Sequence, residues 1–301
     1  MMHAVDAYVA VRRAAGFALT NAECLLRSFA RCAGTRGETH VRTATAMQWA
    51  TQASSIAQRD ERLKTVRRFA LHVHAEDQRH DIPPRNVFGH RKTRRLPFIY
   101  TQTDIQRLLQ AASRLGPPGT LRPYAYTTLF ALLAATGLRI SEALALRLDD
   151  VTQDGLLIRK TKFRKDRLVP LHETARAGLE SYLRLRQREA PNNPHVFVSR
   201  GRPLLRLTVY STFRTLLRQI PLEGEPRGKR PRIHDMRHTF AARALETAPQ
   251  QRDHVSRHML ALSTYLGHRN VSATYWYFEA TPLLMRNISG ACESFWKGDR
   301  P

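Results

Sequence analysis

The chain has 301 residues, which at the usual domain size of about 100–200 residues is enough for two domains. Its composition, 42% hydrophobic and 25% charged residues, is that of a globular protein and excludes wholesale disorder. Lys and Arg number 49 against 25 Asp and Glu, so the net charge of +24 favours a polyanionic partner, with nucleic acid ahead of an anionic membrane surface.

The apolar and cysteine patterns predict a cytoplasmic protein without a membrane segment. The longest apolar run, residues 129–135, falls far short of the ~20 residues that cross a bilayer. The first residues lack the basic-then-apolar order of a signal peptide. The three cysteines, Cys24, Cys32 and Cys292, show no CxxC spacing, which favours a reducing compartment.

Apolar residues at helical spacing predict helices over residues 5–15, 21–30, 44–52 and 55–73, and so a helical DNA-gripping domain over 1–82. Pro83-Pro84 then ends the helical pattern, and a basic linker is predicted over 83–98. Its cations could follow a DNA backbone, although an ordinary solvated linker is the alternative. The linker residues predicted to bind DNA are Arg91, Lys92, Arg94 and Arg95.

Phe98 and Tyr100 are expected to anchor the linker to the core rather than to stack on a ligand.

The sequence after the linker predicts a mainly α catalytic domain over 99–285 that contains a small antiparallel sheet. A C-terminal tail is predicted over 286–301. Thr101 and Asp104 fit a capping box, and an apolar helix over 124–136 is stopped by Gly137. Short strands are predicted over 156–158 and 167–170, on either side of a basic turn, and over 195–198. The other predicted helices cover 140–146, 174–188, 207–219, 235–246, 259–267 and 271–280.

Four segments of this domain stand out as candidates for a catalytic site. Each is commonplace alone, because an Arg at a helix start or a Gly-His at a helix end is usually structural. In chain order they are Thr136-Gly137-Leu138-Arg139-Ile140-Ser141-Glu142, Lys162-Phe163-Arg164-Lys165-Asp166-Arg167, His234-Asp235-Met236-Arg237 and Leu266-Gly267-His268, with Tyr275 and Tyr277 shortly after.

In order and spacing these segments resemble the tyrosine recombinase family, which includes the phage integrases. The resemblance is strong over residues 100–285 and loose over 1–98. It implies a catalytic set whose last member, Tyr277, lies nine residues after His268. That set is Arg139, Lys162, His234, Arg237, His268 and Tyr277, with Glu142 in support. The resemblance also implies a covalent 3′-phosphotyrosyl intermediate and strand exchange between paired DNA sites, by an oligomer expected to be a tetramer and with accessory proteins as an option.

The chemistry of phosphodiester cleavage agrees with these roles. Two guanidiniums, Arg139 and Arg237, could grip the non-bridging oxygens where charge spreads, in the place of a metal ion. The phenol of Tyr277 has a reference pKa of ~10, so it needs a proton acceptor, for which His234 is the natural candidate. Lys162 is the natural acid for the leaving 5′-oxygen, and His268 would add a hydrogen bond to the phosphate.

Neighbouring residues complicate two of these assignments. Tyr275 and Tyr277 would diverge by about 200° on a helix, so we predict Tyr277 as the nucleophile and Tyr275 as a packing residue. Arg164 and Lys165 are predicted to bind DNA at the hairpin tip, and Lys165 is the next candidate if Lys162 is not the acid.

No metal or other cofactor is expected. His254 and His258 have the i, i+4 spacing of a zinc site, but only Asp253 lies close enough in sequence to help complete one. We therefore expect these histidines to lie on a helix near the DNA.

The favoured function is integration, excision or transposition of a mobile element. A type IB topoisomerase-like enzyme with similar chemistry is one alternative, since it would relax any supercoiled plasmid without paired sites. A non-catalytic DNA-binding regulator on the same fold is another, although it should have lost part of the catalytic set. An apolar stretch over 281–296 is expected to pack either on a neighbouring protomer or on its own domain.

Overall fold

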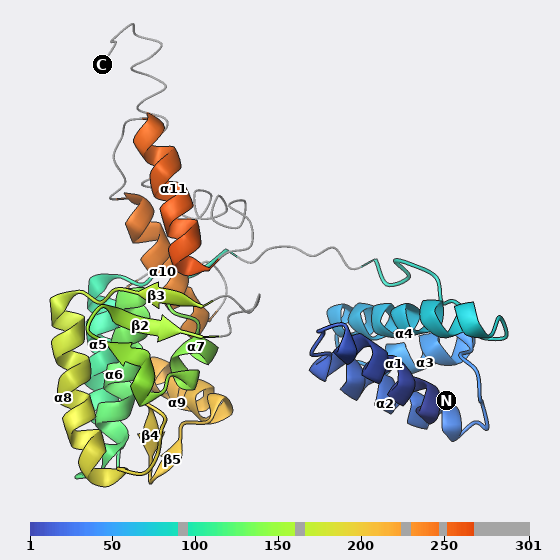
Figure 1. Cartoon of the computed structure of the whole chain (residues 1–301), viewed down its shortest axis with the longest axis horizontal. Helices are drawn as coiled ribbons and strands as arrows, with labels where there is room; N and C mark the ends of the chain where they lie inside the picture. The colour runs from blue at the N-terminus through green and yellow to red at the C-terminus, as the bar shows by residue number, and fades with distance from the viewer. Residues whose placement is uncertain (90–95, 160–165, 224–229, 247–251, 268–301) are drawn as a thin grey trace, which may run out of the picture. The chain divides into compact units, whose positions relative to one another are not determined.

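The computed structural model describes residues 1–89, 96–159, 166–223, 230–246 and 252–267 (Figure 1). The chain divides into two compact units, Met1–Arg94 and Arg95–Pro301. Among the described residues, no helix is both long and apolar enough to span a membrane.

The first unit is a four-helix bundle closed around apolar side chains. Leu63 and Phe69 lie in the buried stripe of its longest helix, and Tyr8 meets Phe69 edge to face with ring centres 5.5 Å apart. Ser55 caps the start of that helix by accepting a hydrogen bond from the Gln58 N–H (3.2 Å). The helices are α1 (Met2–Ala14), α2 (Thr20–Gly34), α3 (Thr43–Thr51) and α4 (Ile56–Glu76).

The segment after α4 folds back onto the loop that precedes α3. The Asp81 N–H donates to the Val41 carbonyl, and the Asp81 carboxylate accepts from the Thr43 N–H, each at 2.9 Å. The Arg67 guanidinium donates to the Pro83 carbonyl. These bonds fasten the chain to the bundle as far as Pro83.

In its described residues the second unit is mainly helical and carries two small antiparallel sheets. One sheet has the strand order β1-β2-β3, with Leu156 opposite both Val151 and Val169, and the other pairs β4 with β5. The elements are α5 (Gln102–Ser113), α6 (Leu121–Thr136), α7 (Ile140–Ala145), the 3-10 helix η1 (Leu148–Asp150), β1 (Val151–Thr152), β2 (Gly155–Ile158), β3 (Arg167–Val169), α8 (Glu173–Glu189), β4 (Val198–Ser199), β5 (Arg202–Pro203), α9 (Arg206–Gln219), α10 (Ile233–Glu246) and α11 (Arg252–Leu266).

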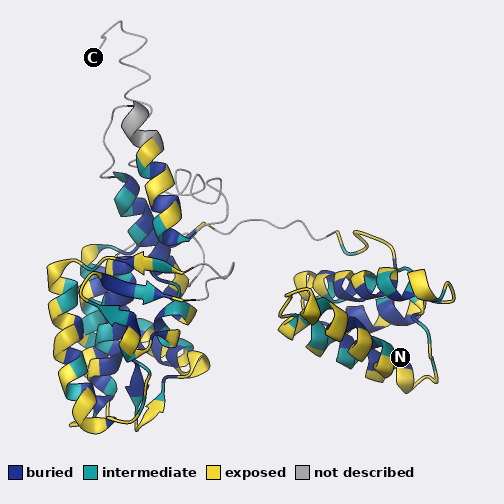
Figure 2. Cartoon of the chain, in the orientation of Figure 1, coloured by how far each residue is buried: buried dark blue, intermediate teal, exposed yellow. Residues whose placement is uncertain are grey.

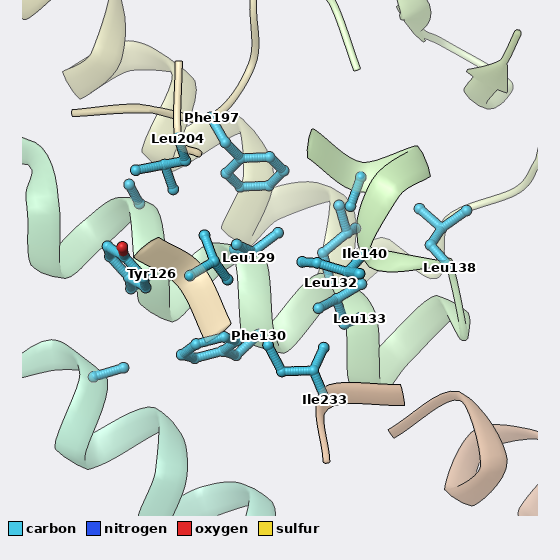
Figure 3. Close-up of a cluster of buried hydrophobic side chains, with 14 of the residues drawn as sticks. Tyr126, Leu129, Phe130, Leu132, Leu133, Leu138, Ile140, Phe197, Leu204 and Ile233 are labelled. Carbon is cyan, nitrogen blue, oxygen red and sulfur yellow. The ribbon is translucent and has the colours of Figure 1, made fainter. Parts of the chain in front are cut away.

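Helix α6 forms the centre of this unit and is buried along most of its length (Figure 2). It contacts α5, α8 and α10, and Leu129, Phe130 and Leu133 are at most 1% exposed (Figure 3). Phe130 packs edge to face on Phe213, with ring centres 5.6 Å apart. Because α6 is packed on several sides, its C-terminal end is held in place and fixes the position of the residues that follow.

Phe98 and Tyr100 anchor the start of the second unit, which confirms the predicted core role over stacking on a ligand. They are 6% and 1% exposed and meet edge to face. The Tyr100 N–H donates to Thr239 Oγ1 (3.0 Å), and its hydroxyl donates to the Arg232 carbonyl (3.1 Å). These bonds tie residues 98–100 to the beginning of α10.

Most of the predicted elements are present. The capping box at Thr101 and the helix stop at Gly137 both form. The strand expected over 195–198 is largely wrong, since His195 makes only an isolated bridge to Arg147 and β4 begins at Val198. Helix α11 begins seven residues before the expected position, 259. The helix expected over 271–280 lies outside the described residues.

Candidate active site

The break between α6 and α7 places the first predicted catalytic residue. Gly137 ends α6 with φ +61°, in the left-handed region that favours glycine. A Cβ at this position would lie 2.6 Å from Phe240 Cδ1, so the close packing also requires glycine. Two residues later, the extended backbone of Arg139 begins α7.

Arg139 is held by the first turn of its own helix and by the end of another. Its N–H and Nη1 donate to the two oxygens of Glu142, at 3.0 and 2.7 Å. Its Nη2 donates to the Gly267 carbonyl (3.1 Å), just beyond the end of α11. The side chain is 28% exposed, so solvent still reaches it.

Arg237 connects the ends of α6 and α11 from α10. It is 2% exposed, and its guanidinium donates to the carbonyls of Gly137 (2.8 Å) and Leu266. Arg139 and Arg237 thus bond two adjacent carbonyls, Gly267 and Leu266. The structure therefore brings together two guanidiniums whose positions in the sequence lie far apart.

His234 lies in the first turn of α10, three residues before Arg237. Its side chain reaches solvent, yet enough protein surrounds the ring that burial lowers its pKa, and the positive charges of Arg237, Arg232 and Arg139 lower it further, against the opposing charge of Asp235. The neutral form of His234 therefore dominates at pH 7. A neutral imidazole beside two guanidiniums can accept a proton.

Glu142 is the acidic partner of this cluster. Burial by itself would raise its pKa, but hydrogen bonds from Arg167 and Arg139 together with the charge of Arg167 lower the pKa to about 2. Glu142 therefore stays ionised at every pH at which the protein would be assayed. With a 10% exposed side chain, it is a nearly buried negative charge.

Arg167, at the first position of β3, belongs to the cluster although the sequence alone predicted no role for it. Its Nη2 and Nη1 donate to Glu142 Oε2 (2.8 Å) and Oε1 (3.2 Å), and its Nε donates to the Tyr265 carbonyl (2.9 Å). An arginine that opens an otherwise apolar strand after a basic turn was the available signal.

The remaining predicted site residues lie outside the described residues. The β2–β3 hairpin is described up to Arg159 and again from 166, and the chain after α11 is described to Gly267. The residues concerned are Lys162, Arg164, Lys165, His268, Tyr275 and Tyr277, together with Arg91, Lys92, Arg94 and Arg95 of the linker.

Comparison with known proteins decides the family. Residues 99–282, more than half of the chain, match the model of the phage integrase family. The chain belongs to that family. It is 40% identical to a protein of Sinorhizobium fredii named as an integrase/recombinase, y4rB, over 98% of this chain and 97% of the relative. It is 35% identical to tyrosine recombinase XerD of Caulobacter vibrioides, over 72% of this chain and 68% of that protein.

Solved structures confirm the predicted fold class of this phage integrase family member. XerA recombinase aligns with a TM-score of 0.51 and 20% identity, over 99% of this chain and 97% of that one. A lambda integrase tetramer bound to a Holliday junction aligns with a TM-score of 0.62 and 16% identity, over 92% and 76%. With the family established, the chain is a tyrosine recombinase, an enzyme that cuts and rejoins DNA strands.

His258 of this phage integrase family member is engaged in helix packing. Its Nε2 donates to the Ala244 carbonyl (2.6 Å) and so joins α11 to the end of α10. The side chain of His254, the other half of the considered zinc pair, lies outside the described residues.

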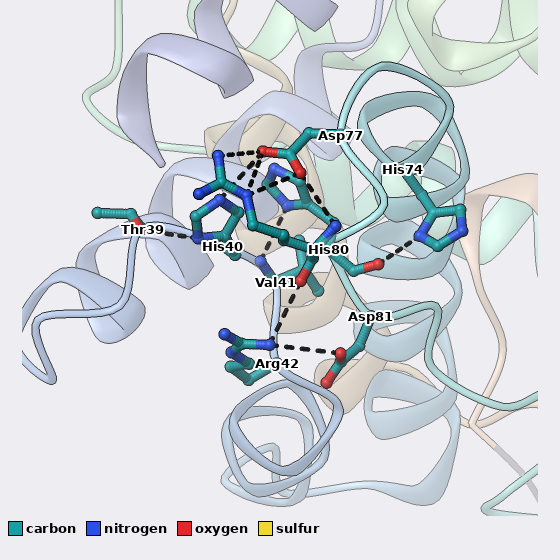
Figure 4. Close-up of polar contacts among 9 residues, drawn as sticks. Thr39, His40, Val41, Arg42, His74, Asp77, His80 and Asp81 are labelled. Atoms are coloured by element: carbon teal, nitrogen blue, oxygen red, sulfur yellow. Dashed lines mark hydrogen bonds and ion pairs between the residues drawn. The ribbon is translucent and has the colours of Figure 1, made fainter.

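A second group of histidines lies in the first unit, where His40, Asp77 and His80 bring potential ligand atoms within 4.8 Å of one another (Figure 4). The Val41 N–H donates to Nδ1 of His80 (3.0 Å), so in the neutral ring Nε2 carries the proton and cannot bind a metal. Burial and the nearby His40 lower the pKa of His80, which favours that neutral ring. The Asp77 carboxylate accepts from both Arg79 and His40.

These bonds are typical of a structural hydrogen-bond network that joins two segments, and they do not fit a metal site. They join the loop before α3 to the segment after α4, the same two segments that Asp81 connects. The group therefore explains how the first unit is closed, and it adds no chemistry to the cluster around Arg139.

Proposed function

We propose that this chain is a site-specific recombinase that integrates, excises or transposes a mobile element by exchanging strands between paired DNA sites. The observation that carries the proposal is the pair of guanidiniums, Arg139 and Arg237, held on adjacent carbonyls at the end of α11. Two forked cations at one point suit the non-bridging oxygens of a phosphodiester in its transition state.

The proposed cleavage step is a transfer of the phosphoryl group to tyrosine. The Tyr277 oxygen attacks phosphorus while the bond to the 5′-oxygen breaks, which leaves a 3′-phosphotyrosyl link. His234 takes the phenol proton, and Lys162 gives a proton to the leaving 5′-oxygen. His268 donates to a non-bridging oxygen. The reverse step, with a 5′-hydroxyl from the partner site as the nucleophile, rejoins the strands.

The lowered pKa of His234 supports its role as the acceptor of that proton. A histidine that is mainly neutral at pH 7 can take the phenol proton, and the product imidazolium can later return it when the strand is rejoined. Glu142, ionised throughout, would hold Arg139 in position during both steps.

We propose that both units bind DNA. We propose a core-binding domain over 1–82, a basic linker over 83–98, a catalytic domain over 99–285 and a tail over 286–301, in line with the division into two compact units. The linker cations named above would follow the DNA backbone, and Arg164 and Lys165 would contact it from the hairpin. A net charge of +24 supports several phosphate contacts.

Strand exchange requires two sites at once, so we propose that the active form is a homo-oligomer, a tetramer on paired sites. The lambda integrase tetramer on a Holliday junction supports this assembly by its likeness in fold. The apolar tail over 281–296 would pack on a neighbouring protomer. Accessory proteins could assist the assembly. Because the proposed substrate is DNA and the relatives named above are bacterial proteins, we propose that the reaction takes place in the bacterial cytoplasm.

The test is recombination between defined sites. A binding site is selected from random duplexes with the Tyr277→Phe protein, and two copies are placed on a supercoiled plasmid. We expect wild-type protein to delete or invert the DNA between the copies, and to leave a plasmid without sites supercoiled. Relaxation of the site-free plasmid at the same rate would instead identify a topoisomerase, and binding without any covalent complex would identify a regulator.

Binding is expected to be strongly salt-sensitive, because cations replace the counterions of the DNA. With about ten phosphate contacts and a slope of about −0.9 per contact, doubling the salt concentration lowers the affinity about 500-fold. Cleavage is expected to proceed in EDTA, since two guanidiniums stabilise the phosphate. Filter binding across a salt series measures the slope, and cleavage abolished by EDTA would contradict the metal-free mechanism.

Charge substitutions locate those contacts. Replacing Arg91, Lys92 and Arg94 by Gln is expected to reduce the slope by about 3, as three contacts are lost. The control is Arg27→Gln, because Arg27 is already paired with Asp6 and Glu23 in the first unit. This control is expected to change the slope by less than 1.

A further inference from the structure

Three consecutive carbonyls at the end of α11 each accept a hydrogen bond from a different arginine. Tyr265 accepts from Arg167, Leu266 from Arg237, and Gly267 from Arg139. The last carbonyls of a helix lack partners within the helix and carry its partial negative charge, so guanidiniums are favourable there. Two of the three arginines belong to the proposed catalytic set, and the third does not.

Of the two arginines that contact Glu142 in the described part of the chain, Arg167 is the more buried. Its side chain is 12% exposed, against 28% for Arg139. Glu142 Oε1 accepts from both guanidiniums, and Oε2 accepts from Arg167 and from the Arg139 N–H. Arg167 thus neutralises a nearly buried carboxylate, and the positive charge of the group is left on Arg139, the side chain that solvent reaches.

The fit around Arg167 is close. Gly267 has φ +64°, and a Cβ there would lie 3.1 Å from Arg167 Nη1. Lys162 lies five residues before Arg167 in the sequence, and His268 follows Gly267 directly. Arg167 therefore fixes the base of the β2–β3 hairpin, Glu142 of α7 and the end of α11 to one another.

We propose that Arg167 is a positioning residue for strand cleavage, which holds Glu142 as the anchor of Arg139 and joins the hairpin to the end of α11. The role rests on the proposed function. Arg167 itself does not touch the phosphate; it acts through Glu142. A misplacement of about 1 Å at a reacting group costs on the order of 10²-fold in rate, which sets the size of the expected effect.

Single-turnover cleavage of a nicked suicide duplex by the full chain tests this role. Arg167→Gln is expected to cleave about 100-fold more slowly, with the Kd for the same duplex within about threefold of wild type. Arg167→Lys keeps the charge but loses the forked pair of donors, so a loss of about tenfold is expected. The control is Arg159→Gln on the same hairpin, where Arg159 pairs with the buried Asp150 outside the cluster; it should cleave within about threefold of wild type.

Two further readouts separate positioning from general stability. In the Glu142→Gln protein, replacing Arg167 should cost less than about threefold, because both residues act through one contact. The ratio of wild-type to Arg167→Gln rates should also grow as the pH falls from 7 to 5. Without Arg167, Glu142 loses the hydrogen bonds and the charge that do most to hold its pKa down, so its pKa rises and the carboxylate that anchors Arg139 protonates at a higher pH than in wild type. Titrating groups that both proteins share, such as His234, affect the two rates equally, so their effect cancels in the ratio.

The outcomes are distinguishable. A wild-type rate for Arg167→Gln, the same loss in the Glu142→Gln background, or a ratio that is flat with pH overturns the positioning role. If circular dichroism shows Arg167→Gln unfolded, Arg167→Lys carries the same comparisons, and a wild-type rate for it overturns the role. A wild-type protein that forms no covalent band on the selected site overturns the proposed function, and the role of Arg167 with it.

Discussion

The Tyr277→Phe protein is expected to bind its DNA site within about threefold of wild-type affinity and to form no covalent protein–DNA complex. The substitution removes only the hydroxyl oxygen that would attack phosphorus, while the aromatic ring itself is kept. Since a nucleophile contributes to the transition state and hardly to DNA binding, the loss falls on the rate. Trapping on a suicide duplex, followed by denaturing electrophoresis, measures it.

Tyr275→Phe is the matched control, with the same atoms removed two residues away. On the helix predicted over 271–280 these two side chains would diverge by about 200°, so only one would face the phosphate. The control is expected to retain the covalent band, and peptide mapping of the wild-type complex should find DNA on Tyr277. A phosphopeptide at Tyr275, or a covalent band from Tyr277→Phe, would reverse the assignment.

Features set by local sequence could be predicted well. The capping box at Thr101 and the left-handed stop at Gly137 depend on residues only a few positions apart, so single-sequence reasoning reaches them. Strands β1 and β5, with two residues each, were missed because two residues show no alternation. The polar residues at the start of α11 likewise gave no apolar period, so the predicted helix began too late.

Contacts between distant segments could not be predicted from residue patterns. Arg167 is 25 residues from Glu142 and 98 from Tyr265, and no local rule links these positions. The hydrogen bond from Val41 to His80 likewise joins positions 39 residues apart. Motif order pointed to Arg139 and Arg237, but not to the shared helix end on which the fold brings them together.

That helix end also explains why a cluster of three arginines can be stable. Glu142 compensates one positive charge, and the carbonyls of Tyr265, Leu266 and Gly267 supply partial negative charge to all three. The net positive charge that remains is what a DNA phosphate would meet. The same contacts that stabilise the fold therefore prepare the electrostatics of the site, which is why large effects are expected from changes in this cluster.

Arg139→Ala is expected to slow cleavage about 10²–10³-fold while the Kd for DNA rises less than about tenfold, the pattern of a lost donor to a transition-state oxyanion. The fold should survive, because Glu142 keeps both donors from Arg167 and no buried carboxylate is left unpaired. A thermal melt followed by circular dichroism checks that point. Single-turnover cleavage of the suicide duplex gives the rate.

A substrate with a methylphosphonate at the scissile position separates charge stabilisation from shape. Its methyl group replaces one non-bridging oxygen, so less negative charge requires stabilisation in the transition state. On this substrate, each stereoisomer measured separately, the loss caused by Arg139→Ala is expected to shrink below about tenfold for at least one isomer. Arg159→Ala, which removes an arginine outside the cluster, should show no such difference between substrates. An equal loss on phosphate and methylphosphonate would mean that Arg139 acts by holding the fold, because a group that stabilises charge cannot be equally important where that charge is smaller.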